Sequence, residues 1–404
     1  MKAVLFVMDG LGDWPIPELN GRTPLEAADI PNMNRLSKEG INGMHYGLRP
    51  GIPVGSDTGH LAIFGYDPFE TYSGRGAFEA LGAGFELKKG DVAFRANFAT
   101  VENGVIVDRR AGRSDYMMKE LSASIDGIKI EDVEIIFKHT VEHRGVLILR
   151  GSGLSKNVSD TDPHGANVAP LKPVPTAPDG EKTARVLAKF LEQAHSVLSA
   201  HEGNKKRMEK GIKPANVVLL RGAGTLPHIK PLDELYHINA VCIAGGALYK
   251  GVAKAVGMRV LEVPGATGKY DTDLKSKGLY AVKELEQGTD FVFIHVKATD
   301  NAAHDKNPLK KKEMIEKVDR ELIPQIMNTA ELIVVTGDHT TSSITGEHTG
   351  DAIPLLMWGK GVRTDAVDRF GERTCARGNL GIINARDIVP LMLNPFAKVE
   401  KFGE

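Results

Sequence analysis

Cysteine and glutamine are scarce in this chain of 404 residues. The two cysteines, Cys242 and Cys375, lie far apart and form no Cys-x-x-Cys pair. A disulfide framework is therefore not expected, and reduced thiols in a cytoplasmic protein are the simplest interpretation. Glutamine occurs only at positions 193, 287 and 325, whereas lysine and glutamate are plentiful. This depletion of a thermolabile amide indicates a thermophilic source.

The chain also lacks an excess of charge and a long apolar run. Its formal net charge is −1, so nothing in the charge balance favours nucleic acid or an anionic membrane as a partner. No apolar stretch is long enough to cross a bilayer. The apolar segment 1–8 resembles the start of a signal peptide, but Asp9 interrupts it and no small-residue cleavage site follows, which favours a strand. The sequence leaves the oligomeric state open.

Short apolar runs alternate with helical patterns through most of the chain. Residues 2–8, 291–296 and 332–336 are rich in β-branched and other apolar residues and predict buried strands. Residues 310–327 predict a helix between the last two strands, bent or ended by Pro324. Such strands, separated by helices, indicate an α/β fold with a mainly parallel sheet covered on both faces. The length of 404 residues suggests two or three domains, and a hydrophobic fraction of 42% is enough for a sizeable core.

The middle of the chain has a different pattern, which predicts a smaller α/β domain. Residues 92–107 predict a hairpin with its turn at 102–104, and residues 166–179 contain four prolines and predict a loop. Further strands are expected at 132–137, 145–150 and 216–221, and an amphipathic helix at 181–200. We therefore expect a core domain formed by residues 1–87 and 241–404, interrupted by an inserted domain at 88–240.

Three of the predicted core strands run directly into an aspartate. These residues are Asp9, Asp300 and Asp338, and histidines follow the last two at positions 304, 339 and 348. An aspartate after a strand is often only a helix cap or turn residue. However, ligands of open parallel sheets bind at the carboxyl ends of the strands, where these side chains would meet. Carboxylates and imidazoles without cysteine suit Mn²⁺, Zn²⁺, Co²⁺ or Mg²⁺, and six such groups fit a pair of divalent metal ions.

A glycine-flanked serine precedes a predicted helix. In Gly55-Ser56-Asp57-Thr58-Gly59-His60-Leu61, the glycines allow a tight turn and a close ligand, and the helix begins near Ser56. A hydroxyl at a helix N-terminus beside a metal is a suitable nucleophile for phosphoryl transfer. Ser56 is alternatively an ordinary helix cap, and Thr58 could serve equally as nucleophile.

Together these motifs resemble the cofactor-independent phosphoglycerate mutases of the alkaline phosphatase superfamily, in their shorter, archaeal branch. The segment from Gly55 to Leu61 is similar to the Gly-Asn-Ser-Glu-Val-Gly-His-Leu motif of the longer branch, and the acids and histidines follow the order of the superfamily's metal ligands. The resemblance covers nearly the whole chain. It implies an alkaline-phosphatase-like core with a mainly parallel sheet between helices, plus a smaller inserted α/β domain.

The resemblance also implies roles for the individual residues. One metal ion would be bound by Asp9, Ser56, Asp338 and His339, and the other by Asp300, His304 and His348. The inserted domain would close over the substrate as a lid. The candidate substrate-binding residues are Arg109, Arg110, Arg113, Asp162, His164, Arg221 and Lys269. Solvated surface charge is the alternative for each arginine. The Asp-Gly-Arg-Asp motif of the longer branch is missing here, which bears on the substrate residues rather than on the metal ligands.

The activity implied by the resemblance is the interconversion of 3-phosphoglycerate and 2-phosphoglycerate in glycolysis and gluconeogenesis. It would proceed through a phosphoserine at Ser56, without 2,3-bisphosphoglycerate, on a small phosphorylated carboxylate substrate. The nearest alternative is another phosphohydrolase or phosphomutase of the same superfamily, since the metal ligands alone do not separate these enzymes. A non-catalytic binding protein on the same fold is a further alternative, and the intact set of metal-ligand residues argues against it.

Overall fold

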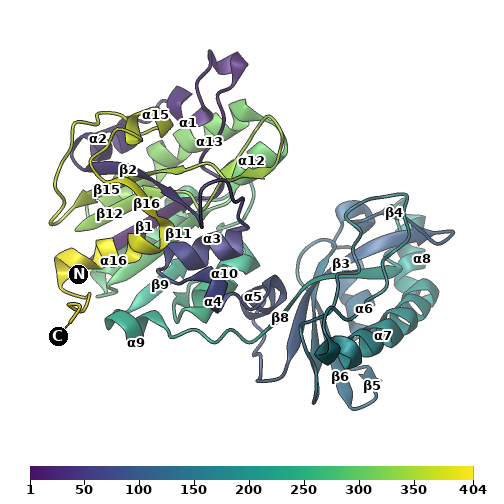
Figure 1. The fold of residues 1–404 in the computed structure, drawn as a ribbon. Coiled ribbons are helices and arrows are strands. Elements are labelled where there is room, and N and C mark those ends of the chain that lie inside the picture. Colours follow the sequence, from purple (N-terminus) through teal and green to yellow (C-terminus); the bar gives the residue numbers. More distant parts are fainter. Residues whose placement is uncertain (404) are drawn as a thin grey trace. The chain divides into compact units, whose positions relative to one another are not determined.

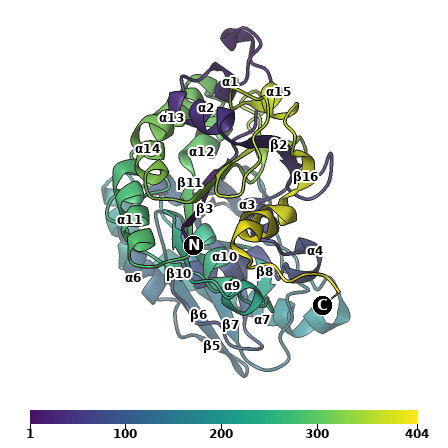
Figure 2. The same ribbon diagram turned by 90° about the vertical axis from the view of Figure 1, so that its left-hand side faces the viewer.

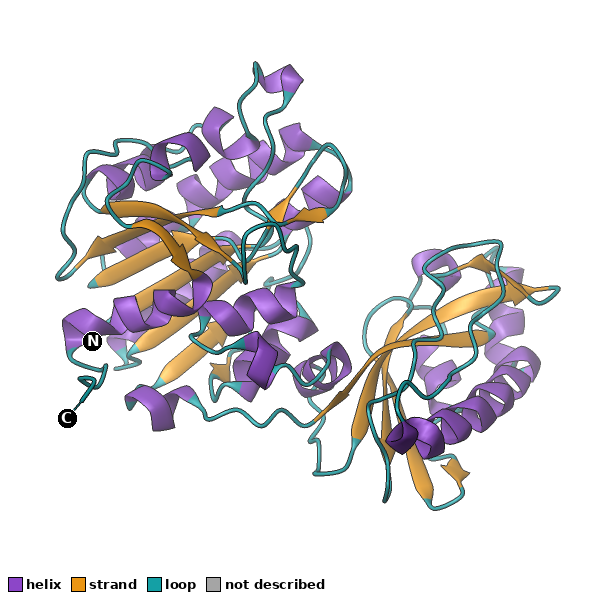
Figure 3. Cartoon of the chain, viewed as in Figure 1, coloured by secondary structure: helices purple, strands orange, loops and turns teal. Residues whose placement is uncertain are grey.

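The computed structural model of the protein describes residues 1–403, which divide into two compact units. The larger unit combines residues 1–72 with residues from 229 onwards, and the smaller unit is the continuous segment 73–228. Both units are drawn in Figures 1 and 3. Among residues 1–403, no helix is both long and apolar enough to cross a membrane.

Eight strands of the larger unit form one sheet: β1 (Ala3–Met8), β2 (Ile41–Tyr46), β9 (Ala240–Ile243), β10 (Arg259–Val260), β11 (Phe291–Val296), β12 (Leu332–Thr336), β15 (Ile353–Gly359) and β16 (Gly381–Asn384). Their order is β10-β9-β11-β1-β12-β15-β2-β16. The pairs among β10, β9, β11, β1 and β12 are all parallel, and β15 is antiparallel to both neighbours. The first strand of the chain therefore lies between two strands from its last third.

Helices cover both faces of this sheet, as the two views in Figures 1 and 2 show. This explains why β1, β11 and β12 are apolar along their whole length and fully buried. The helices of this unit are α1 (Pro24–Ala27), α2 (Pro31–Lys38), α3 (Ser56–Ile63), α4 (Pro68–Thr71), α9 (Leu232–Tyr236), α10 (Ala247–Ala255), α11 (Leu274–Glu286), α12 (Ala298–His304), α13 (Pro308–Glu321), α14 (Ile323–Met327), α15 (Glu372–Cys375) and α16 (Ile388–Leu393). A short hairpin, β13 (Thr340–Thr341) and β14 (His348–Thr349), follows β12.

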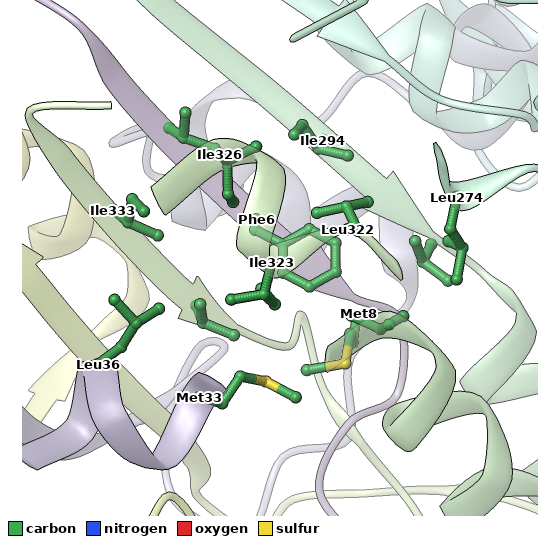
Figure 4. Close-up of a cluster of buried hydrophobic side chains, with 14 of the residues drawn as sticks. Phe6, Met8, Met33, Leu36, Leu274, Ile294, Leu322, Ile323, Ile326 and Ile333 are labelled. Carbon is green, nitrogen blue, oxygen red and sulfur yellow. The ribbon is translucent and has the colours of Figure 1, made fainter. Parts of the chain in front are cut away.

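The main core of the larger unit lies between the sheet and helices α2, α11, α13 and α14 (Figure 4). Phe6 and Met8 of β1 contribute the side chains at its centre, and Ile323 and Ile326 of α14 pack against them. Burying side chains of this size contributes about 1.5–3 kcal/mol each. The core fixes β1 in the middle of the sheet, and so fixes the position of the residue that follows it, Asp9.

The smaller unit is a six-stranded antiparallel sheet packed against helices. Its strands are β3 (Val92–Glu102), β4 (Val105–Asp108), β5 (Lys129–Ile130), β6 (Val133–His139), β7 (Arg144–Arg150) and β8 (Val217–Thr225). Its helices are α5 (Arg75–Gly82), α6 (Met118–Ala123), α7 (Glu181–Ala200) and α8 (Glu202–Glu209). The long strand β3 pairs with β4, β7 and β8. It is therefore the structural centre of this unit.

The expected α/β class and mainly parallel core sheet are confirmed. The helix expected at 310–327 is interrupted near Pro324, as predicted: α13 ends at Glu321 and α14 begins at Ile323. The expected domain boundaries at 87/88 and 240/241 are too late in the sequence, since the units divide after Tyr72 and after His228. The reason at the first boundary is α5, which packs on β3 and β8 of the smaller unit. At the second boundary, Lys230 already bonds Tyr66 of the larger unit.

Candidate active site

Adjacent strands bring the predicted acids of the larger unit together. In the sheet, Met8 of β1 pairs with Val296 of β11, and Val7 pairs with Thr336 of β12. The three strands consequently end side by side, and each is followed by one of the predicted aspartates. Asp9 comes directly after β1, Asp300 lies in the first turn of α12, and Asp338 lies two residues beyond β12.

Asp9, Asp338, His339 and Ser56 form one cluster around the His339 imidazole. The Nε2 atom of His339 lies 3.3 Å from Asp9 Oδ1, 3.3 Å from Asp338 Oδ2 and 3.3 Å from Ser56 Oγ. All four side chains are buried. The two carboxylates and the imidazole offer ligand atoms close enough together to hold a single ion.

Asp300, His304 and His348 form a second cluster beside the first. His304 Nε2 lies 3.3 Å from Asp300 Oδ2 and 3.3 Å from His348 Nε2. Each of the two imidazoles contacts a backbone carbonyl through Nδ1, His304 that of Gly346 and His348 that of Val54, both at 2.7 Å. An imidazole held in this way presents Nε2 to a metal ion. The His339 and His348 rings stack at 3.6 Å, and with Asp300 they form a second possible ligand set.

The buried carboxylates of this site favour the binding of a cation. Burial raises the pKa of Asp338 to about 7, and the negative charge of Asp9 adds to the rise. Burial also acts to raise the pKa of Asp9, but Lys297 and the neighbouring imidazoles outweigh it and hold that pKa well below its ordinary value. Asp9 Oδ1 and Asp338 Oδ2 are both buried without a hydrogen-bond partner. Unpaired buried carboxylate oxygens are costly, and hard divalent ions prefer such ligands, so the residues present fit a metal centre.

Ser56 is the first residue of α3, and its surroundings answer two questions that the sequence left open. Gly55, rather than Ser56, is the N-cap of the helix, and the Ser56 hydroxyl makes no capping bond. The Thr58 hydroxyl instead donates to the Gly55 carbonyl at 2.9 Å. The absence of a side chain at Gly59 lets α3 approach the opposite loop, since a Cβ there would lie 2.8 Å from the Asp338 carbonyl oxygen. Of the two hydroxyls, Ser56 is therefore the one placed in the acid cluster.

Three residues next to these clusters, Lys297, Tyr249 and His295, were not among the predicted site residues. The Lys297 ammonium lies 2.7 Å from Asp300 Oδ2 and 3.3 Å from Asp9 Oδ2, so it bridges the two clusters. The Tyr249 hydroxyl of α10 donates to Asp9 Oδ2, and His295 Nε2 of β11 lies 3.2 Å from the same oxygen. His295 is the polar residue in β11, a strand that is otherwise apolar. An imidazole inside such a strand is a signal that sequence reasoning could have used.

The predicted basic residues lie mostly in the smaller unit, around a cavity of about 130 Å³. Arg109, Arg110, His164 and Arg221 are part of its lining, together with four residues that the sequence did not suggest: Arg95, Asn97, His143 and Arg144. Asp162 is buried behind Arg109, whose guanidinium donates to both its oxygens at 3.0 and 2.7 Å. The cavity is therefore strongly cationic.

Two predicted substrate residues are not part of this lining. Arg113 is exposed on the loop after β4 and does not line the cavity. Lys269 belongs to the larger unit, on a loop whose Gly268 carbonyl accepts a 2.8 Å hydrogen bond from Asn301 of α12. Lys269 therefore lies on a loop that is bonded to α12, the helix that contains Asp300 and His304.

Four residues that line the cationic cavity have a buried polar atom without a hydrogen-bond partner. Arg95 Nε, Asn97 Oδ1, His143 Nδ1 and Arg221 Nε are all buried and make no hydrogen bond. Burial lowers the pKa of Arg95 to about 9, although Glu79 opposes this effect. Burial also lowers the pKa of His143 to about 4, with Arg144 and Arg95 contributing. The Nε–H groups of Arg95 and Arg221 are buried donors without partners, and such donors in a basic pocket are suited to an oxyanion.

Comparison with known proteins gives consistent matches along the whole chain. Residues 37–204 match the family described as 2,3-bisphosphoglycerate-independent phosphoglycerate mutase. Proteins of that name from Pyrococcus horikoshii and Thermococcus kodakarensis are 48% and 47% identical to this chain, covering 100% of it and 98% and 99% of their own lengths.

Solved structures agree with these sequence matches. A protein from Pyrococcus horikoshii superposes with a TM-score of 0.88 at 42% identity, over 100% of this chain and 99% of that one. A cofactor-independent phosphoglycerate mutase from Thermoplasma acidophilum superposes with a TM-score of 0.70 at 38% identity, over 98% of this chain and 99% of its own.

Proposed function

We propose that the phosphoryl group passes through Ser56 at a two-metal centre. The premise is that this chain belongs to the family of 2,3-bisphosphoglycerate-independent phosphoglycerate mutases. It is therefore an isomerase that interconverts 3-phosphoglycerate and 2-phosphoglycerate. The observation that carries the proposal is the Ser56 hydroxyl, which lies 3.3 Å from His339 beside two carboxylates with unpartnered oxygens. A hydroxyl so placed, and not used as a helix cap, has the position of a nucleophile.

The two clusters supply the ligands of the proposed centre. Asp9, Ser56, Asp338 and His339 would hold one divalent ion, and Asp300, His304 and His348 the other. When bound, Mn²⁺, Zn²⁺, Co²⁺ or Mg²⁺ would lower the pKa of the Ser56 hydroxyl and offset the negative charge of the phosphoryl oxygens. The backbone carbonyls of Gly346 and Val54 hold His304 and His348 in the orientation that directs Nε2 to the ion.

In the proposed reaction, Ser56 accepts the phosphoryl group in one step and returns it to glycerate in a second step. In the first, a bond forms between Ser56 Oγ and phosphorus, the ester bond to glycerate breaks, and the serine proton is released while the departing oxygen gains one. In the second, the other hydroxyl of glycerate attacks phosphorus, loses its proton, and the Ser56 oxygen regains one. Glycerate has to stay bound between the steps, because a free phosphoserine would otherwise pass its phosphoryl group to water.

We assign the retention of glycerate to the cationic cavity of the smaller unit. Arg109, Arg110 and Arg221 provide guanidinium groups for the substrate's carboxylate, and Asp162 fixes the first of them through two hydrogen bonds. The alternative activity, hydrolysis of a small phosphate ester, uses the same metal ligands and needs no such retention. The two activities therefore differ in the fate of the phosphoryl group.

An assay of both products tests this proposal. Metal-loaded protein receives 3-phosphoglycerate without bisphosphoglycerate, and 2-phosphoglycerate and free phosphate are followed together. Wild type should isomerise with little phosphate released. Arg110→Ala and Arg221→Ala should raise the Michaelis constant and the released fraction, because glycerate escapes before it reorients. Arg185→Ala removes an exposed arginine of α7 that pairs with Glu131, and serves as the control. Phosphate release as fast as isomerisation in wild type would establish the hydrolase instead.

A further inference from the structure

The two carboxylate oxygens of Asp9 have opposite surroundings. Oδ2 receives the Tyr249 hydroxyl and lies 3.3 Å from Lys297 Nζ and 3.2 Å from His295 Nε2. Oδ1 is buried and has no hydrogen-bond donor, and it faces His339 Nε2 at 3.3 Å. One oxygen of this carboxylate is thus held by the protein, and the other is left for a ligand.

Tyr249 is built rigidly into this arrangement. Its ring stacks on the His295 ring at 3.6 Å and meets the edge of the His60 ring at 5.3 Å, and the side chain is almost fully buried. The ring has no room to turn away, so its hydroxyl stays directed at Asp9. Lys297 holds Asp9 less specifically, because its ammonium also bonds Asp300 and its side chain is 28% exposed. Among the described residues, the Tyr249 hydroxyl is the group that donates a hydrogen bond to Asp9 Oδ2 without also bonding Asp300.

We infer that Tyr249 is a positioning residue, whose hydroxyl fixes Asp9 so that a single oxygen, Oδ1, is presented to a divalent cation. The inference rests on the proposed metal centre. Without the hydroxyl, Oδ2 keeps only the longer contacts with Lys297 and His295, so the carboxylate is held less firmly about its Cβ–Cγ bond and Oδ1 is less precisely placed. Groups that orient a metal ligand in this way commonly change metal affinity by 10- to 100-fold when they are removed.

The test is Tyr249→Phe in the full chain, stripped of metal by a chelator and titrated with Mn²⁺ in a calorimeter. The phenylalanine keeps the stacked ring and removes one oxygen atom. We expect two binding events in wild type and, in the variant, a 10- to 100-fold weaker affinity for one of them, with the other unchanged. Tyr66→Phe is the matched control, because Tyr66 is also buried in the larger unit and donates a 2.8 Å hydrogen bond, to the Lys230 carbonyl, away from every acid of the site.

A second readout separates positioning from general loosening of the fold. The metal-free variant should unfold at the temperature of metal-free Tyr66→Phe, and mutase turnover should return at raised Mn²⁺ concentration without a change in the Michaelis constant. Equal Mn²⁺ affinities in Tyr249→Phe and wild type would overturn the inference, and so would an equal loss at both sites. A wild type that binds no ion at all would overturn the proposed metal centre itself.

Discussion

The His143 side chain should make the stability of the smaller unit depend on pH. His143 is 4% exposed, and the charges of Arg144, Arg95 and Arg113 disfavour its protonated form, whereas Asp108 favours it. These surroundings lower its pKa from 6.5 to about 4 in the folded protein. A lowered histidine pKa means that the unfolded chain takes up the proton first. The contribution of His143 to the free energy of unfolding is therefore fully present above pH 6.5 and is lost as the pH falls towards 4.

The size of the effect follows from the two pKa values. Between pH 7.5 and pH 5, linkage between 6.5 and about 4 gives a loss of about 2 kcal/mol from this one group. His143→Gln removes the titration and keeps a neutral polar side chain. The variant should lose less stability than wild type over this interval, and the difference corresponds to roughly 4–8 °C in Tm for a domain of this size.

The measurement is thermal unfolding of chelator-treated protein at a series of pH values, so that metal release on acidification does not contribute. The control is His195→Gln, an exposed imidazole on α7 whose Nδ1 contacts the Asn216 carbonyl, and its pH profile should follow wild type. A constant difference in Tm between His143→Gln and wild type from pH 7.5 to 5 would refute the reasoning. It would mean that the arginine-lined pocket accommodates a charged imidazole.

Three further predictions concern the two units separately. Ser56→Ala should abolish turnover while metal content and Tm stay near wild type, because Asp9, Asp338 and His339 still offer a ligand set and the Ser56 hydroxyl makes no capping bond; residual turnover above a few per cent would reassign the nucleophile. Chelation should abolish activity and Mn²⁺ should restore it, with elemental analysis of active protein giving two ions per chain; one ion or none would contradict the proposed centre. Arg207→Met should cost about 2–4 kcal/mol, since its buried guanidinium bonds the carbonyls of Ala111 and Tyr116, and it should raise the Michaelis constant through the loop that carries Arg110; an unchanged urea midpoint would count against this.

The parts of the fold set by local pattern were predictable from the sequence. The strands at 291–296 and 332–336 and the helix at 181–200 have the expected bounds, because a buried β-branched run or an amphipathic period specifies them without help from distant residues. The boundary at Tyr72 was not predictable in this way. The helix α5 looks like any other helix in the sequence, and only its packing on β3 and β8 assigns it to the smaller unit.

The same distinction holds for the candidate site. The acids at strand ends could be found, because the topology of parallel strands brings their carboxyl ends together. Tyr249 and Lys297 could not, since a tyrosine in a helix and a lysine after a strand are ordinary residues until their contacts with Asp9 are known. Arg95 and His143 were also missed, as each lies in or beside a strand where a solvated side chain is the usual expectation.

The central place of β1 in the sheet has a consequence for synthesis on the ribosome. Its two neighbours, β11 and β12, are translated some 290 to 330 residues later, which takes on the order of tens of seconds at typical rates of elongation. Residues 73–228 form a continuous unit and can fold during that interval. The apolar segment of β1 stays unpaired over the same time and is therefore prone to aggregation. Stalled nascent chains ending near residue 285 should therefore contain a protease-resistant fragment of the smaller unit and a protease-sensitive N-terminus.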